Sequence, residues 1–577
     1  MARFGRRSRL RWSSFASEED DRATVAGRSF SPSSARDLLG ARAPFAGPVP
    51  DLLSPSPRMR IDAAALEQQM AFAFAGGDSS ERISALLAEQ EPPASTWDPT
   101  YFAHHLFIES WVAHLATLPF GGRPLDADPI SLQRLLSHPP EEEVLRFRHQ
   151  ILEELLGSER TQTELLEVYR ELRKLRGLYL RSPPEGLYEG IRRRVEILGA
   201  IRSTLEKIAR SFQGSKSGLS KLHDLALQRI SQEPFQRLVD LLEHDHQRAM
   251  VNLEIRLGGD GRVRELAVRR MEEATQNRFH RGPIGRFLTK LSMWARGYRF
   301  ADEELIDRWI DAVYADFSEL LPGFLKLIGE LELYLTALAF REKAREKGLD
   351  VCLPVLGEGE KLEGLFNPLL LAQGVTPIPC DVVRHGPGST TIITGPNSGG
   401  KTRLLQSIGL AQLLAQTGFF VPAKSARLRR VPYLFCSLIQ EDSYDQSEGR
   451  LGTELLRIRR IFERAPPASL VIIDELCSGT NPSEGEEIFL LVISLLSELE
   501  PETFVTTHFL DFASGLEQRG EGMSLRFLQV ELGPDQRPTF AFVPGVAKTS
   551  LAAQAASRLG VTRDELRSLV KRHRPSG

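Results

Sequence analysis

The sequence predicts a multidomain α + α/β fold, in which a long helical domain precedes an α/β domain. The chain has 577 residues, more than one hydrophobic core usually serves. Apolar residues recur at helical spacing through most of residues 61–347, whereas short apolar runs alternate with helix-period stretches after residue 348. Hydrophobic residues make up 41% and charged residues 26%, a composition typical of globular proteins.

Residues 1–60 are rich in Arg, Ser and Pro and show no sustained period, which predicts a flexible tail. A basic arm that contacts nucleic acid is the alternative. Five arginines open the chain, but four acidic residues follow at 18–21 in place of an apolar segment, so we expect no export signal.

Long amphipathic helices are expected over 61–347, and they suggest antiparallel arms. One apolar stripe contains Leu165, Val168, Leu172 and Leu175. Alternating residues near 251–268, on either side of a glycine-rich turn, predict a small β-hairpin within this helical domain.

The stretch 278–300 has basic and aromatic residues and no acid, so it is the best local candidate for a nucleic-acid contact. Its leading cations are Arg278, Arg281, Arg286 and Lys290. A helix with a buried aromatic face and a solvated basic face would produce the same pattern.

Global charge does not draw the chain to polyanions, because 73 Lys and Arg oppose 76 Asp and Glu. The four cysteines are far apart, which favours neither a disulfide framework nor a zinc site. No apolar run reaches the roughly 18 to 20 residues that span a bilayer. We therefore expect a cytoplasmic protein without a membrane partner.

A glycine-rich motif, G-x-x-x-x-G-K-T, lies between a predicted strand at 390–393 and a predicted helix from about 403. Its backbone N–H groups suit phosphate oxygens, Lys401 suits the outer phosphates, and the Thr402 hydroxyl suits Mg²⁺. The predicted nucleotide-binding residues are Gly395, Pro396, Asn397, Ser398, Gly399, Gly400, Lys401 and Thr402.

Two acids follow the apolar run Leu470–Ile473, which is the form of a Walker B element. Asp474 is the predicted Mg²⁺ ligand with Thr402, and Glu475 the predicted general base. Another strand-like run, 503–507, places His508 where it could contact the γ-phosphate or its water. We therefore predict Glu475, His508 and Lys401 as catalytic residues and ATP with Mg²⁺ as cofactors.

These motifs resemble the ATPase motifs of the MutS family. The resemblance rests on Thr394–Thr402, on Asp474–Gly485 with its Gly-Thr-Asn-Pro, and on Thr506-Thr507-His508. Within the family they are most similar to the bacterial paralogue branch that lacks the mismatch-reading domain. Gly364–Leu370 and Gly545–Ser550 also resemble family segments.

The resemblance implies a helical lever and clamp domain over 61–347, and over 348–577 a P-loop NTPase (ABC-like) domain ending in a helical dimerisation segment. It implies a homodimer that clamps mismatched, branched or distorted DNA in an ATP-dependent way, in mismatch repair or in control of recombination. In the family a loop from the other subunit completes each ATP site. Here the corresponding stretch, 445–454, lacks the usual Ser-Thr-Phe, and Ser447 and Thr453 are the candidate hydroxyls.

Departures from the family leave other functions open. Phe107-Ile108-Glu109 has the letters of the mismatch-reading wedge, but it lies in an apolar stretch where we expect a core phenylalanine. We also expect no C-terminal nuclease module, because the chain stops soon after the capping box Thr562–Glu565. The alternatives are a paralogue acting on ribosomes or RNA, a transporter motor, and a nucleotide-gated scaffold with little turnover.

Overall fold

A computed structural model confirms the predicted combination of a helical region and a mixed α/β region. It describes residues 49–56, 95–179, 187–246, 250–257, 263–272, 310, 312–314, 316–317, 320–357, 360–438, 449–477, 480–519, 523–548 and 561–573. Within these residues, no helix has the length and apolarity needed to cross a bilayer.

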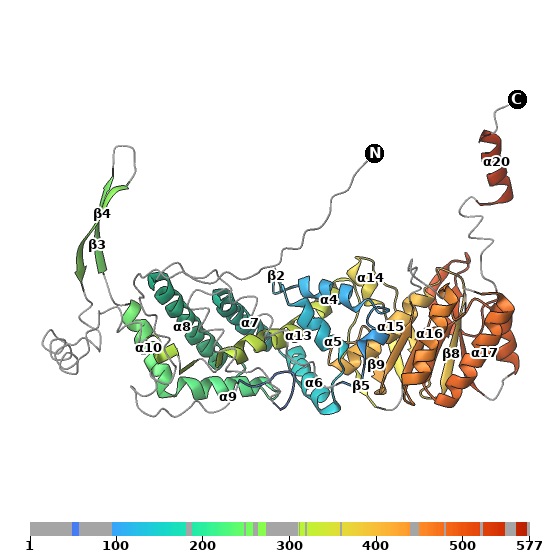
Figure 1. Ribbon diagram of the computed structural model, residues 1–577, viewed down its shortest axis with the longest axis horizontal. Coiled ribbons are helices and arrows are strands. Elements are labelled where there is room, and N and C mark those ends of the chain that lie inside the picture. Colours follow the sequence, from blue (N-terminus) through green and yellow to red (C-terminus); the bar gives the residue numbers. More distant parts are fainter. Residues whose placement is uncertain are drawn as a thin grey trace, which may run out of the picture. The chain divides into compact units, whose positions relative to one another are not determined.

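Helices make up most of the described part of the chain between residues 95 and 346 (Figure 1). They are α4 (Ile108–Thr117), α5 (Pro129–Ser137), α6 (Glu142–Gly157), α7 (Glu159–Tyr179), α8 (Leu187–Arg210), α9 (Leu219–Ile230), α10 (Glu233–His246) and α13 (Leu320–Glu346). A 3₁₀ turn (Pro99–Tyr101) and two short strands, β1 (Pro119–Phe120) and β2 (Arg123–Pro124), lie beside α4 in the sequence.

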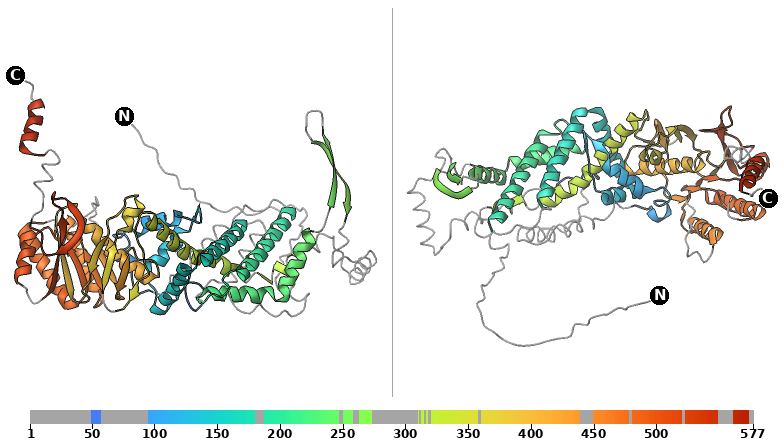
Figure 2. Two further views of the ribbon diagram at one scale, coloured as in Figure 1. Left: turned by 180° about the vertical axis from the view of Figure 1, so that it is seen from behind. Right: turned by 90° about the horizontal axis from the view of Figure 1, so that it is seen from above.

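The predicted apolar stripe of α7 is buried. Leu165, Val168, Leu172 and Leu175 are all fully shielded from solvent. Helices α7 and α8 contact each other, and Figure 2 shows them side by side in both views. Long amphipathic helices thus form the core here because each buries one face against a neighbour.

Residues 49–56 differ from the expected flexible tail. The Leu52 side chain is fully buried, its N–H donates to Glu330 Oε2 at 2.8 Å, and its carbonyl accepts from the Tyr334 hydroxyl. Asp51 forms an ion pair with Lys326 at 2.6 Å. This segment therefore docks on α13, because its backbone satisfies polar groups of α13 that are otherwise buried.

Phe107 also differs from expectation. It takes a left-handed φ of 53°, stands immediately before α4, and is 40% exposed. Ile108 and Trp111 occupy the core in its place. The expected core phenylalanine is wrong, because the turn before α4 directs this side chain outward.

Two antiparallel strands, β3 (Met250–Leu257) and β4 (Val263–Glu272), pair where the sequence suggests a hairpin. The expected turn between them lies outside the described residues. So do the four cations Arg278, Arg281, Arg286 and Lys290.

A six-stranded sheet organises the α/β region, with strand order β10-β11-β12-β8-β13-β14. The first five strands are parallel and β14 is antiparallel to β13. The strands are β8 (Ser389–Thr394), β10 (Leu434–Ser437), β11 (Leu470–Ile473), β12 (Glu502–Thr506), β13 (Ser524–Leu532) and β14 (Pro538–Pro544). The carboxyl ends of β8, β10, β11 and β12 therefore share one edge, where α/β sheets usually bind ligands.

Helices cover both faces of this sheet: α15 (Lys401–Thr417), α16 (Gly449–Arg464), α17 (Pro482–Leu499) and α18 (Leu510–Arg519). Ile473 joins the buried cluster containing Phe489 of α17 and Leu516 of α18. Its neighbour Ile472 points the other way, toward Gly409 of α15. Burial on both faces explains why β11 is a continuous apolar run.

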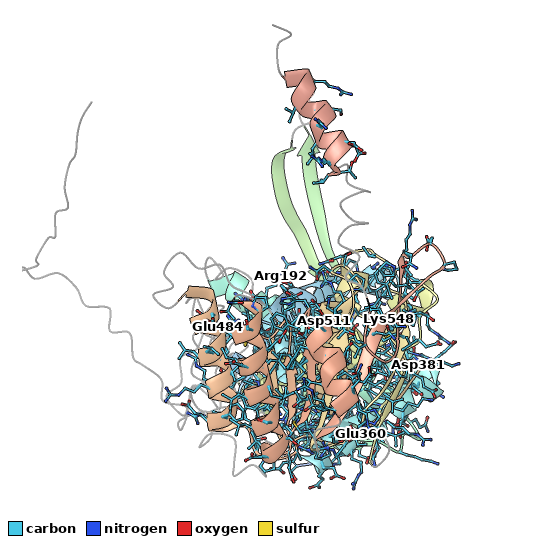
Figure 3. All side chains as sticks on the ribbon, turned by 90° about the vertical axis from the view of Figure 1, so that its right-hand side faces the viewer. Arg192, Glu360, Asp381, Glu484, Asp511 and Lys548 are labelled. Atoms are coloured by element: carbon cyan, nitrogen blue, oxygen red, sulfur yellow. The ribbon has the colours of Figure 1, made fainter. Side chains whose placement is uncertain are left out.

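A smaller sheet, β5-β9-β6-β7, is tied to the large one by a buried ion pair. Its strands are β5 (Val355–Leu356), β6 (Lys361–Leu365), β7 (Cys380–Val383) and β9 (Ser425–Leu428), and α14 (Pro368–Ala372) follows β6. Arg384, just after β7, pairs with Glu502 of β12 and with Glu360, which Figure 3 labels. The side chains of Arg384 and Glu502 have no exposed surface.

The last described helix is α20 (Arg563–His573), and the capping box predicted for it is confirmed. Glu565 N donates to Thr562 Oγ1 at 3.4 Å, and Thr562 N donates back to Glu565 Oε2 at 3.4 Å.

Candidate nucleotide site

The glycine-rich loop Gly395–Gly400 connects β8 to α15, and its backbone leaves no room for larger residues. Gly395 has a φ of 140° and Gly400 a φ of 91°, both in the region that favours glycine. A Cβ on Gly395 would lie 2.6 Å from Val530 Cγ2, and one on Gly399 would lie 2.9 Å from the Pro396 carbonyl. The loop thus requires glycine at these positions, and a glycine-rich loop at the start of a helix suits close approach by phosphate.

Lys401 begins α15 and is buried beneath this loop. Its Nζ donates to the carbonyls of Gly395 at 3.0 Å and Pro396 at 3.2 Å. Burial lowers the pKa of the ammonium, and the nearby carboxylates of Glu475 and Asp474 oppose that effect. The loop therefore presents a fixed positive charge at the start of a helix, where anions bind favourably.

Asp474 follows β11 and bonds to two threonines from different elements. Its Oδ2 accepts from Thr402 Oγ1 of α15 at 2.5 Å, and its Oδ1 accepts from Thr506 Oγ1 of β12 at 2.5 Å. Burial raises the pKa of Asp474 and both hydroxyl hydrogen bonds lower it. The carboxylate is thereby held at the shared carboxyl edge of β8, β11 and β12.

The position of Glu475 is fixed through its backbone and not through its side chain. It has a left-handed φ of 51°, its N–H donates to Thr506 Oγ1 at 2.7 Å, and its side chain is only half-buried. Such a conformation is costly for a non-glycine residue and recurs at functional sites. Thr506 thus fixes both acids of the pair at once.

The remaining predicted residues have different positions. Asn397 and Ser398 are exposed on the loop, and Ser398 has a φ of 68°. His508 lies two residues beyond β12, exposed, with its ring centroid 4.2 Å from that of Phe509. Ser447 lies outside the described residues, and Thr453 lies in the second turn of α16.

Three residues without an assigned role in the sequence-based prediction also lie at this site, although Thr506 stands in the Thr-Thr-His motif and Asn367 in the segment Gly364–Leu370. Thr506 joins the two acids. Asn367 donates from Nδ2 to the Arg403 carbonyl at 3.0 Å, which supports the first turn of α15. Phe540 on β14 is 41% exposed, has a φ of 62°, and lies beside Gly400, whose added Cβ would be 3.2 Å from Phe540 Cδ1. An exposed aromatic within an alternating strand would have been the only sequence signal for Phe540.

A magnesium nucleotide fits this arrangement. Mg²⁺ prefers hard oxygen ligands, and the Thr402 hydroxyl and the Asp474 carboxylate are both of this kind. A hydrogen bond between them holds the two oxygens close together. The cradle of glycines and the buried Lys401 supply donors and charge for phosphate oxygens.

Comparison with known proteins agrees with this geometry. Residues 391–564 match the family MutS domain V, which includes the loop, both acids and His508. The chain is 33% identical over 291 residues to Endonuclease MutS2 of Thermus thermophilus, covering 48% of this chain and 36% of the relative. It is 34% identical over 240 residues to Endonuclease MutS2 of Streptococcus gordonii, covering 41% of this chain and 29% of the relative.

A third relative, Endonuclease MutS2 of Pelotomaculum thermopropionicum, is 34% identical over 272 residues, covering 46% of this chain and 32% of that protein. The aligned segment spans about a third of the length of each curated relative. Together the matches define a protein with a MutS-type ATPase domain. The matches support a MutS-family ATPase of the MutS2 branch.

Proposed function

We propose that this chain is a Mg²⁺-dependent ATPase of the P-loop, ABC-like class, acting on DNA. The observation that carries the proposal is the hydrogen-bond chain from Thr402 through Asp474 and Thr506 to Glu475. It gathers a helix N-terminus and two strand ends around one carboxylate pair. MutS family proteins are ATPases, which agrees with this use of the site.

Each residue has a role in the proposed reaction. Lys401 and the loop N–H groups of residues 395–400 hold the phosphates. Thr402 and Asp474 hold Mg²⁺, which supplies positive charge to the terminal phosphates when bound. Glu475 accepts a proton from the attacking water, and His508 at the end of the neighbouring strand orients that water or the γ-phosphate.

Phe540 is our candidate for the adenine contact. An exposed aromatic ring in a strained backbone conformation stands next to the glycine loop, where the base of a bound nucleotide needs an apolar surface. Stacking on the ring would repay part of the cost of the left-handed φ. The Phe540→Ala variant should therefore weaken ATP binding more than turnover at saturation.

The proposed partner is distorted, branched or mismatched DNA. Helices of residues 61–347 act as levers, and ATP binding and hydrolysis in residues 348–577 change their positions on the DNA. The proposed contacts to the DNA phosphate backbone remain the cations Arg278, Arg281, Arg286 and Lys290. We further propose a cytoplasmic homodimer, in which Ser447 or Thr453 of one subunit completes the other subunit's site.

Steady-state ATP hydrolysis in the presence of different nucleic acids tests this function. The purified chain is assayed alone, with homoduplex, with mismatched duplex and with a four-way junction. Turnover altered by distorted DNA alone supports the DNA-gated ATPase. Turnover indifferent to every DNA favours the ribosome or RNA alternative, and tight ATP binding without turnover favours the scaffold.

A further inference from the structure

We infer that His105 is a positioning residue for the Mg²⁺ ligand Asp474, acting through the peptide group between Ser437 and Leu438. This inference rests on the proposed ATP site. It adds a residue from the helical region, far outside the family match at 391–564, to the machinery of that site.

One peptide group connects the two residues. Asp474 N donates to the Ser437 carbonyl at 2.9 Å, and Leu438 N, in the same planar peptide group, donates to His105 Nδ1 at 3.4 Å. Hydrogen bonds in series polarise one another, so the histidine bond strengthens the carbonyl that holds the Asp474 backbone. The same Asp474 carries the Thr402 and Thr506 hydrogen bonds on its side chain.

The protonation state of His105 suits an acceptor. Burial lowers its pKa to about 4, and the nearby charges of Arg457 on α16 and of His104 act in the same direction. The ring is therefore neutral near pH 7 and Nδ1 is free of a proton whenever it accepts from Leu438 N. A leucine in place of His105 would remove the Nδ1 acceptor, so the buried Leu438 N–H would lose this hydrogen bond.

Neighbouring contacts hold His105 in place from two directions. The Tyr101 ring lies 5.1 Å from that of Phe435 on β10, and Asp98 N donates to the Tyr433 hydroxyl at 2.8 Å. Leu106 lies against Gly409 of α15, where an added Cβ would be 3.0 Å from Leu106 Cδ2. The segment 98–106 thus contacts both the strand beside the Walker B strand and the helix that begins with Lys401.

The test compares His105→Leu with His105→Asn, whose side-chain oxygen can accept near the Nδ1 position, and with His104→Leu as an exposed neighbouring control. The first readout is the rise in thermal unfolding temperature caused by ADP with Mg²⁺ and by ADP with EDTA. The second is the Mg²⁺ concentration that half-saturates ATP hydrolysis. A purely structural role would weaken both ADP responses equally.

We expect His105→Leu to raise the half-saturating Mg²⁺ concentration about fivefold, the size of one lost hydrogen bond. Its unfolding temperature should respond less to Mg²⁺–ADP but normally to ADP with EDTA. His105→Asn should restore the Mg²⁺ response, and His104→Leu should match the wild-type chain.

Equal Mg²⁺ dependence in all variants would overturn the inference, as would a His105→Asn variant as impaired as His105→Leu. If His105→Leu does not fold, the asparagine variant decides alone, because it must keep the wild-type Mg²⁺ response. A wild-type chain that neither binds ADP nor hydrolyses ATP would instead overturn the proposed ATPase.

Discussion

Replacing Thr506 with valine tests how the two acids are held. The change keeps the shape of the side chain but removes the hydroxyl that donates to Asp474 Oδ1 and accepts from Glu475 N. A hydrogen bond to a charged group contributes about 1.5 to 3 kcal/mol, so we work with a loss of about 2 kcal/mol. If that loss falls on the transition state, kcat drops about 30-fold.

The pH dependence of Thr506→Val has a defined sign. The Thr506 hydrogen bond lowers the pKa of Asp474, and burial raises it. Removing the hydroxyl therefore raises that pKa further, so Asp474 is protonated at higher pH and binds Mg²⁺ less well there. The acid limb of the kcat/KM profile should move to higher pH.

Thr507→Val is the matched control for this experiment. Thr507 is equally buried, but its hydroxyl accepts from Phe509 N at 3.1 Å, so it serves the backbone after β12 instead of the two acids. It should lower the free energy of unfolding by about 1 kcal/mol and leave the acid limb in place. Wild-type kcat in Thr506→Val, or the same pH shift in both variants, would refute the reasoning.

Three further changes probe the glycine-rich loop, the buried Arg384–Glu502 ion pair, and the contact of Arg148 on α6 with the end of α15. Gly395→Ala should weaken ATP binding at least about tenfold in a fluorescent-nucleotide titration, because its Cβ would clash with Val530. Arg384→Met should lower the free energy of unfolding by about 3 to 5 kcal/mol in urea, since it leaves Glu502 charged and buried. Arg148→Met should lower it by about 2 kcal/mol, because the guanidinium donates to the Thr417 and Leu53 carbonyls.

Each of these predictions has a matched control. Gly199→Ala on α8 has open space around its Cβ and should bind ATP normally. Adding Glu502→Gln to Arg384→Met removes the stranded charge and should recover part of the stability. Arg146→Met changes an exposed arginine of the same helix as Arg148 and should cost less than about 1 kcal/mol. Controls as damaging as the test variants would contradict the structural explanation.

Some parts of the fold and the site could be predicted from short stretches of sequence, because burial or backbone conformation restricts the residue type at those positions. Strand β11 buries both faces, so it had to be an apolar run, and Asp474 and Glu475 mark its end. Close approach to the loop backbone requires glycine at 395 and 400, which makes the motif visible.

Other parts depend on contacts between distant segments. Thr506 reaches Asp474 across 32 residues only because β11 and β12 are neighbours in the sheet, and no local pattern states that order. Leu52 lies in a tail-like composition, yet its backbone satisfies the buried Glu330. The role of His105 likewise could not be predicted from the sequence, because it depends on a contact with Leu438, which follows β10.

The most direct test of the account is ATP binding and single-turnover hydrolysis by Glu475→Gln with Mg²⁺, beside Glu498→Gln as an exposed control on α17. Removing a general base typically costs 10²- to 10⁴-fold, so we expect Glu475→Gln to bind ATP as tightly as the wild-type chain and to hydrolyse it at least about a hundredfold more slowly. Glu498→Gln should match the wild type in both. Undiminished hydrolysis by Glu475→Gln would contradict the proposed site.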